Sequence, residues 1–147
     1  CLVGSEMCIR DRLKPLGSVA SGGEISRVML AVKTVLADEE DTPTLIFDEI
    51  DTGISGITAG KVGDRLRLIG KSRQVICITH LPQIAATADH HFLIRKKAEG
   101  TSVRTDVEML DEAASVEELA RLLGGANVTE RVMESAKELK ELAKCER

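Results

Sequence analysis

Two short stretches of the chain carry residues that could act on a phosphate group. Residues 21–24 read Ser-Gly-Gly-Glu just ahead of a helical pattern, and residues 44–49 form an apolar run that ends in the adjacent carboxylates of Asp48 and Glu49. Backbone N–H groups at a helix N-terminus bind anions, and glycine lets a phosphate approach closely. Paired carboxylates can hold Mg²⁺ and orient or deprotonate an attacking water. Each stretch also has a plain structural explanation, namely a capped helix and a strand that ends in an acidic loop.

His80 is a third candidate for the same site, because of its position in the sequence. It follows the apolar residues 75–79, so it stands at the carboxyl end of a second expected strand. An imidazole there can donate to a phosphate oxygen or hold a water molecule. An isolated histidine is more often a core or loop residue, and we assign no role to His90 and His91. The combination is more specific than its parts, because the carboxyl ends of parallel strands meet at one edge of a sheet.

The first half of the chain supplies the elements that would position these groups. A helical pattern runs from Glu24 to about residue 37, with Ser21 as its cap and Glu24 three residues on, as in a capping box. Residues 44–47 and 74–79 are expected to be buried strands, and residues 58–68 and 83–87 to be helices. The expected apolar stripe of the first helix consists of Ile25, Val28, Val32, Val35 and Leu36.

The second half is expected to form a hairpin and two helices. Residues 91–95 and 102–109 alternate enough to be two strands, with residues 99–100 as the turn. A helix is expected to begin at Ser115 and to stop at residues 124–125. The whole pattern predicts an α/β domain, mainly a parallel sheet flanked by helices, with its active edge at the strand C-termini. Thr129 caps a final helix with Val132, Ala136, Leu139 and Ala143 on one face.

Composition limits the class of protein. The 147 residues are 43% hydrophobic and 30% charged, which fits one globular domain or part of one. With two Phe, no Trp and no Tyr, the core must be aliphatic, which suits a parallel sheet covered by helices on both faces. The net charge of −4 does not indicate nucleic-acid binding by the average surface. The basic residues 95–97 are one local patch, for which a solvated strand end is the favoured interpretation.

The cysteines and the apolar runs indicate a compartment. Cys1, Cys8, Cys77 and Cys145 lack the close spacing of a zinc or redox pair, and Cys77 is expected to be a small buried residue. A reducing cytoplasm is the simplest location. No apolar run approaches the ~18 residues of a membrane span, so no membrane contact is expected.

Three segments together resemble SMC-like ATPases of the ABC type. Residues 21–24 resemble the ABC signature motif, residues 45–49 the Walker B strand, and His80 the switch histidine. Order and spacing agree. From about residue 13 onward the chain is most similar to the RecN family of bacterial DNA repair proteins. That similarity is carried by Ser-Gly-Gly-Glu-Ile-Ser-Arg-Val-Met-Leu-Ala (21–31), Phe-Asp-Glu-Ile-Asp-Thr-Gly-Ile-Ser-Gly (47–56) and Thr-His-Leu-Pro-Gln-Ile-Ala-Ala (79–86).

The resemblance implies a site made from two heads that face each other with ATP and Mg²⁺ between them. ATP binding would engage the heads of a homodimer and hydrolysis would release them, in a full-length protein that acts on DNA double-strand breaks. Asp48 would serve Mg²⁺, Glu49 would be the general base or orient the water, and His80 would sense the γ-phosphate. The nucleotide-binding signature that reaches ATP on the opposite head would consist of Ser21, Gly22, Gly23 and Glu24.

The chain also departs from a complete head. A phosphate loop would read Gly-x-x-x-x-Gly-Lys-Ser/Thr, and the nearest match, residues 56–62, has one residue too few. Residues 13–147 are therefore expected to be the C-terminal head lobe, with an N-terminal Walker A lobe as partner. Residues 1–12 do not resemble the family and are expected to be a non-native leader. The D-loop position falls on Ser55, and Asp51 lies too early to take that role.

Two other functions remain open from the sequence. A transporter-type ABC subunit is disfavoured, because transporters usually read Asp-Glu-Pro-Thr where residues 48–51 read Asp-Glu-Ile-Asp. A docking module that kept the fold and lost the chemistry is disfavoured by the presence of Glu49 and His80. Nucleotide binding after mixing with an N-terminal lobe separates this module from an ATPase lobe.

Overall fold

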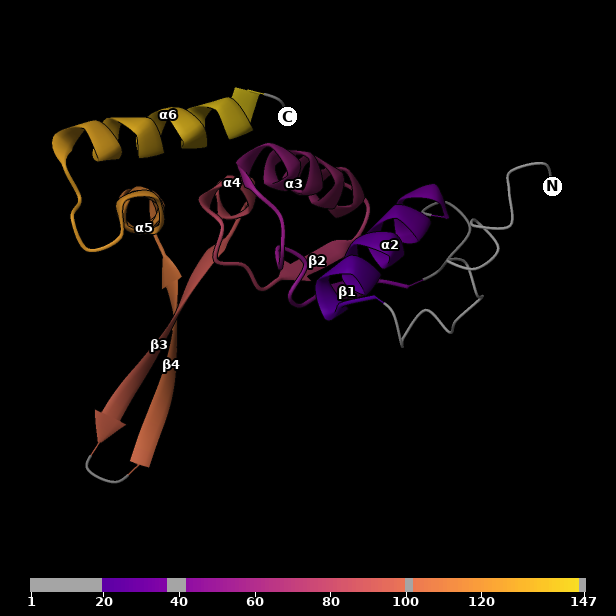
Figure 1. Ribbon diagram of the computed structural model, residues 1–147, viewed down its shortest axis with the longest axis horizontal. Coiled ribbons are helices and arrows are strands. Elements are labelled where there is room, and N and C mark those ends of the chain that lie inside the picture. Colours follow the sequence, from indigo (N-terminus) through magenta and orange to yellow (C-terminus); the bar gives the residue numbers. More distant parts are fainter. Residues whose placement is uncertain (1–19, 37–41, 100–101, 146–147) are drawn as a thin grey trace, which may run out of the picture.

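The computed structural model describes residues 20–36, 42–99 and 102–145 (Figure 1). The leader expected at residues 1–12 lies outside these residues, as does Gly100 of the expected hairpin turn. No helix within the described ranges is long and apolar enough to cross a membrane. The elements are α2 (Gly22–Val35), β1 (Thr44–Phe47), α3 (Gly56–Gly70), β2 (Gln74–Cys77), α4 (Pro82–Ala85), β3 (His91–Glu99), β4 (Ser102–Leu110), α5 (Glu112–Gly124) and α6 (Glu130–Cys145).

The parallel sheet expected from the sequence is formed by β1 and β2, with α3 as the crossover between them. The strands pair in register from Thr44 opposite Gln74 to Phe47 opposite Cys77. The backbone N–H of Ile78 then donates to the carbonyl of Phe47 at 3.0 Å, which extends the pairing past the end of β2. Both strands therefore end at the same edge of the sheet, and the parallel pairing was predicted correctly.

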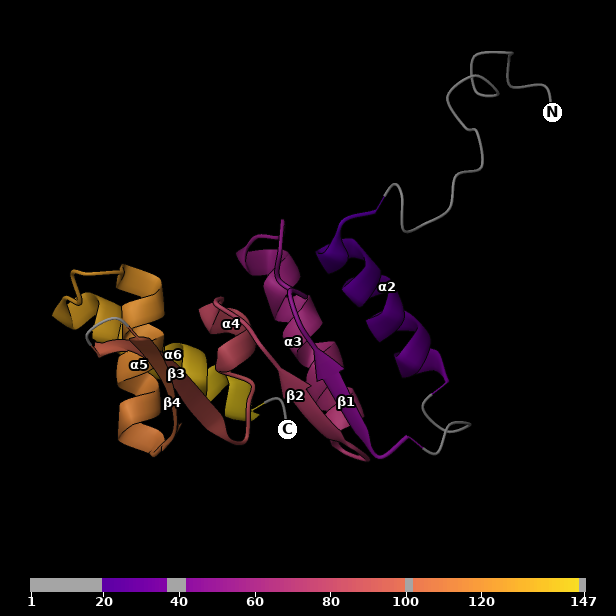
Figure 2. The same ribbon diagram turned by 90° about the horizontal axis from the view of Figure 1, so that it is seen from below.

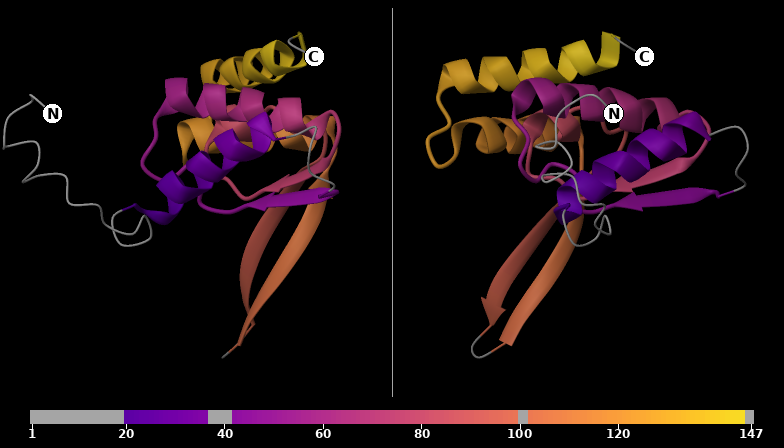
Figure 3. Two further views of the ribbon diagram at one scale, coloured as in Figure 1. Left: turned by 90° about the vertical axis from the view of Figure 1, so that its right-hand side faces the viewer. Right: turned by 45° about the vertical axis from the view of Figure 1, so that its right-hand side comes forward.

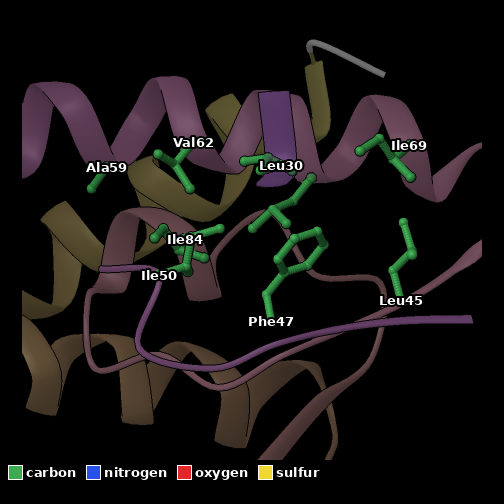
Figure 4. Packing of buried hydrophobic residues seen from close by; sticks show 9 residues of the cluster. Leu30, Leu45, Phe47, Ile50, Ala59, Val62, Ile69 and Ile84 are labelled. Atoms are coloured by element: carbon green, nitrogen blue, oxygen red, sulfur yellow. The ribbon is translucent and has the colours of Figure 1, made fainter. Parts of the chain in front are cut away.

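Helices cover one face of this sheet. The helices α2 and α3 lie on this face (Figure 2). Leu45 and Phe47 of β1 point into a core with α3 and with Leu30 of α2 (Figure 4). The opposite face is open, since Ile46 is 68% exposed and Ile76 and Ile78 are also exposed. The expectation of helices on both faces is therefore wrong for the described part of the chain. The buried core consists of Leu30, Leu45, Phe47, Ile50, Ala59, Val62, Leu66, Ile69 and Ile84.

The helix α2 forms where it was expected, but it buries a different face. Ser21 is its N-cap with both hydrogen bonds of the capping box. The apolar stripe that indicated the helix is largely exposed, because Val28 and Val32 are half exposed and Val35 is 82% exposed. Leu30 and Gly23 are the residues that α2 buries. Periodicity located the apolar stripe, but it could not show that nothing in the described chain covers it.

A second cluster joins α4 to the C-terminal helices. Ala85 and Ala86 pack with Leu119 and Ala120 of α5 and with Ala136 of α6. The expected face of the last helix is confirmed, since Val132, Leu139 and Ala143 pack against this cluster. Thr129 lies just before α6, and its hydroxyl accepts from the N–H of Val132 at 3.4 Å.

The start of α5 differs from the expectation. The helix begins at Glu112, because Asp111 rather than Ser115 is the N-cap and accepts from the N–H of Ala114 at 2.8 Å. Ser115 is buried inside the helix instead. The stop at residues 124–125 is confirmed, with Gly125 at a φ of 64° that favours glycine.

The strands β3 and β4 form the expected antiparallel hairpin, which is longer than the alternating pattern suggested. It extends away from the helices as a two-stranded arm (Figures 1 and 3). One side of the arm is apolar and exposed, with Phe92 opposite Met109 and Ile94 opposite Val107.

Candidate functional site

The carboxylates of Asp48 and Glu49 lie at the end of β1, as expected, and both are exposed. Glu49 has a φ of 55°, and it is the only non-glycine residue with positive φ in the described part of the chain. A side chain in this region costs roughly 1–3 kcal/mol and persists where its surroundings require it, often at a functional site. The carbonyl of Glu49 accepts from the N–H of Thr52 at 3.1 Å, so the strand turns sharply here. This turn places the two carboxylates side by side at the sheet edge.

His80 lies at the same edge, and an acidic residue holds it there. The Nδ1 of His80 is 2.9 Å from Oδ2 of Asp51, whose side chain is 3% exposed. The same oxygen accepts from the hydroxyl of Thr79 at 2.6 Å and from the backbone N–H of His80 at 2.8 Å. Burial raises the pKa of Asp51, but the hydrogen bonds from Thr79 and His80 outweigh it and the pKa is lowered overall. Asp51 is therefore a buried, ionised carboxylate between the two strand ends.

These groups line one open hollow of about 210 Å³ at the carboxyl edge of the sheet. The expected convergence of Asp48, Glu49 and His80 is thus what the structure shows. The residues around the hollow are Asp48, Glu49, Asp51, Thr52, Ile78, Thr79 and His80.

The N-terminal part of α2 is fastened to the loop that carries the carboxylates. The hydroxyl of Ser26 donates to the carbonyl of Asp48 at 3.0 Å. The guanidinium of Arg27 donates to the carbonyls of Ile50 and Thr52, at 3.0 and 2.8 Å. These hydrogen bonds join α2 to the loop of residues 48–52.

The two glycines of residues 21–24 touch the same loop. A Cβ on Gly22 would lie 2.9 Å from Oε2 of Glu49, and one on Gly23 would lie 2.8 Å from the carbonyl oxygen of Glu49. Within one chain the signature residues thus lie beside Glu49. The assignment of the two motifs to two different ATP sites comes from the family resemblance.

The other two residues of this stretch, Ser21 and Glu24, are hydrogen-bonded to each other. The N–H and the hydroxyl of Ser21 both donate to Oε2 of Glu24 at 2.8 Å. The hydrogen bond from the Ser21 backbone, with that from its side chain, lowers the pKa of Glu24.

The fit to Mg²⁺ rests on Asp48. No group of three or more His, Cys, Asp or Glu side chains in the described ranges is arranged to hold a metal by itself. Magnesium at phosphate sites usually takes one or two carboxylates and completes its shell with phosphate oxygens and waters. One oxygen of Asp48 accepts from the N–H of Glu49 at 2.9 Å, and the carboxylate stays exposed to the hollow. Its chemistry and exposure therefore fit such an ion.

Cys77 and the basic residues 95–97 lie outside the hollow. Cys77, expected to be buried, is only partly buried and packs against the core. Burial, together with the charges of Asp51 and Asp48, raises the pKa of its thiol to about 12, which makes it unreactive. The basic residues 95–97 lie within β3 rather than at its end. Lys97 and Arg104 both pair with Asp106, each at 2.9 Å, which offsets part of that charge.

Sequence reasoning left Asp51, Ser26 and Arg27 without a role. Asp51 was considered only for the D-loop, and its partners Thr79 and His80 are 28 and 29 residues away in the sequence. A third acidic residue just after the strand was a signal for a partner at this edge. Nothing in the sequence indicated the roles of Ser26 and Arg27, because their contacts are to backbone carbonyls of the loop after β1.

The fold is similar to that of a solved SMC ATPase structure. A solved structure from a study of "ATP-driven dimerization and DNA stimulated activation of SMC ATPases" matches 80% of this chain and 70% of its own, with a TM-score of 0.52 and 19% identity. The comparison of sequences is more specific, since it finds similarity to the DNA repair protein RecN. The chain is 50% identical over 133 residues to RecN of Halalkalibacterium halodurans, 49% over 127 residues to RecN of Vibrio cholerae and 44% over 129 residues to RecN of Bacillus subtilis.

These matches cover most of this chain and a small part of each relative. They span 90%, 86% and 88% of the chain but 24%, 23% and 22% of the three RecN proteins. The chain therefore corresponds to a C-terminal part of RecN, as the sequence motifs indicated. No protein-family model matches it.

Proposed function

We propose that this chain is the C-terminal lobe of an ATP-hydrolysing head in a RecN-type DNA repair protein. The observation that carries the proposal is the shared hollow at the sheet edge, where Asp48, Glu49 and His80 meet. Phosphoryl transfer needs positioned charge more than covalent help, and two carboxylates with an imidazole supply such charge. The similarity to RecN supports the repair function of the whole protein.

The chain's own residues take distinct roles in this proposal. Glu49 orients and deprotonates the attacking water, because its exposed carboxylate lies at the strand end in a backbone conformation that the loop enforces. Asp48 holds Mg²⁺, and His80 meets the γ-phosphate from the neighbouring strand. Bound Mg²⁺ and ATP would supply the phosphoryl group and neutralise its charge.

Residues 21–24 bind the nucleotide of a second head in this proposal. Ser21 and Gly22 are exposed at the start of α2, and a helix N-terminus is the kind of site that binds anions. An N-terminal Walker A lobe, a second copy of the head and DNA are the proposed partners. The hydrogen bonds from Ser26 and Arg27 would couple the signature helix to Glu49 of its own head.

The experiment is Glu49→Gln in a RecN-type protein that contains this chain together with its Walker A lobe. Glutamine keeps the shape of the side chain but cannot act as a base. We expect ATP turnover, measured by phosphate release, to fall by about 10²–10⁴-fold. Bound ATP should be retained, and light scattering should show engaged dimers at saturating ATP.

The matched control is Glu117→Gln, an isosteric change at an exposed position of α5 away from the hollow. This variant should keep the turnover of the parent protein. Unchanged turnover in the Glu49→Gln variant would remove Glu49 from the reaction. Failure of the parent protein to bind ATP would instead favour a docking module that lost the chemistry.

A further inference from the structure

The buried carboxylate of Asp51 joins the two strand ends of the site. One of its oxygens, Oδ2, accepts from the Thr79 hydroxyl and the His80 backbone N–H at 2.6 and 2.8 Å, and it lies 2.9 Å from Nδ1 of the His80 ring. The hydroxyl of Thr79 in turn accepts from the N–H of Leu81 at 3.1 Å. A buried charge is tolerated when its hydrogen bonds are satisfied in this way.

The ring of His80 depends on this carboxylate for its position. The side chain is 72% exposed, whereas its partner is 3% exposed. Within the described part of the chain, the ring makes its polar contact through Nδ1 alone. An imidazole so exposed would sample several rotamers if that contact were lost.

We propose that Asp51 is a positioning residue that sets the orientation and the tautomer of His80. This inference rests on the proposed function, because it gives the reason why His80 needs a fixed orientation. A carboxylate at Nδ1 keeps the proton on that nitrogen, so Nε2 is the atom left to face the hollow. In the neutral ring, Nε2 accepts a hydrogen bond from water, and in the charged ring it donates to a phosphate oxygen while Asp51 balances the charge.

The lowered pKa of Asp51 supports this role, because it keeps the carboxylate charged at neutral pH. Thr79 supports it as well, since its hydroxyl donates to the same oxygen. Asp51 lies on the loop after β1 and Thr79 on the segment after β2, so the contact also ties the Walker B loop to the switch segment.

The first test uses the 147-residue chain with ¹⁵N-labelled histidine. His80→Gln identifies the resonances of His80 among the three histidines. In the unchanged chain at pH 8 we expect the Nδ1–H tautomer of His80. In Asp51→Ala we expect the ordinary mixture of tautomers in fast exchange, and in Asp51→Asn, which keeps an acceptor oxygen, an intermediate spectrum.

Circular dichroism of each variant separates local release of the ring from unfolding. Asp51→Asn is the variant to compare if Asp51→Ala does not fold. The proposal would be overturned if a folded variant, Asp51→Ala or Asp51→Asn, kept as much of the Nδ1–H form of His80 as the unchanged chain. This test needs no ATP, so its outcome is independent of the proposed ATPase function.

The second test is a double-mutant cycle in the RecN-type protein that carries the Walker A lobe. Loss of a residue that orients a functional side chain typically costs about 10–100-fold in activity, so we expect kcat to fall by that factor in Asp51→Ala with a smaller change in KM. In a His80→Ala background the same change should have no further effect, because its target is gone. An equal loss of kcat in both backgrounds would show that Asp51 acts on the fold rather than through His80.

Discussion

The two glycines at the start of α2 contact different atoms of the same residue. A Cβ on Gly22 would meet Oε2 of Glu49 at 2.9 Å, and this atom is the end of an exposed, flexible side chain. A Cβ on Gly23 would meet the backbone oxygen of Glu49 at 2.8 Å and Cβ and the carbonyl oxygen of Thr52 at 2.9 and 3.0 Å. The two neighbouring glycines should therefore differ in how well they tolerate replacement by a larger residue.

We expect Gly23→Ala to destabilise the chain by about 1–3 kcal/mol, the usual cost of overpacking against atoms that cannot move aside. Gly22→Ala should change the free energy of unfolding by less than about 1 kcal/mol, because the Glu49 side chain can swing away and alanine favours a helix. Urea unfolding of both variants and the parent chain gives the comparison. Equal losses at the two positions would contradict the close backbone approach at Gly23.

Some residues of the site could be predicted from their neighbours in the sequence, and others could not. Asp48, Glu49 and His80 were found from the sequence, because each directly follows an apolar strand and parallel strands end together. Asp51 was missed as their partner, because its contacts join segments 28 and 29 residues apart. The positive φ of Glu49 could not be predicted either, since glutamate has no preference for that conformation.

At the scale of elements, the caps of α2 and α6 and the stop of α5 were predicted better than the ends of β2 and β3. Ser21, Thr129 and Gly125 each act through local backbone hydrogen bonds, which depend on neighbouring residues alone. The cap of α5 was placed at Ser115 although Asp111 takes it, because both side chains can cap a helix. Which one does so is decided by a tertiary contact, the burial of Ser115 against the start of β3.

That contact makes the junction between the hairpin and α5 sensitive to pH. The Nδ1 of His91 lies 2.9 Å from the hydroxyl of Ser115. Burial lowers the pKa of His91 below its ordinary value of 6.5, and Lys140 lowers it further while Glu118 opposes the shift. The unfolded chain therefore binds this proton more readily than the folded chain does. The free energy of unfolding should fall as the pH drops below 6.5 and level off below the folded pKa.

The His91→Gln variant removes this titration and keeps a polar side chain. We expect a smaller loss of stability between pH 7.5 and pH 5 in this variant than in the parent chain, measured by urea unfolding at both pH values. His90→Gln is the matched control, since the neighbouring His90 is exposed. A pH dependence in His91→Gln as steep as in the parent would show that other groups cause it.

At the scale of the whole molecule, the described chain leaves several apolar surfaces open. The face of the sheet opposite the helices carries Ile46, Ile76 and Ile78, and α2 exposes Val28 and Val32. Parallel sheets are normally covered on both faces, and apolar patches of this kind mark interfaces. An aliphatic composition was enough to predict a parallel sheet, but it could not show that the cover of one face would be absent from the described chain.

If an N-terminal lobe covers this face in the proposed head, neighbouring residues of β1 should respond differently to truncation. Leu45 points into the core and is 8% exposed, whereas Ile46 points to the open face and is 68% exposed. In the 147-residue chain, Leu45→Ala should cost about 2–5 kcal/mol in the free energy of unfolding, and Ile46→Ala only about 0.5 kcal/mol. In a protein that includes the Walker A lobe, the cost of Ile46→Ala should rise towards that of Leu45→Ala, because the same side chain becomes part of a core. A cost for Ile46→Ala that stays near its value in the chain alone would show that this face remains open in the complete head, and that the two lobes meet elsewhere.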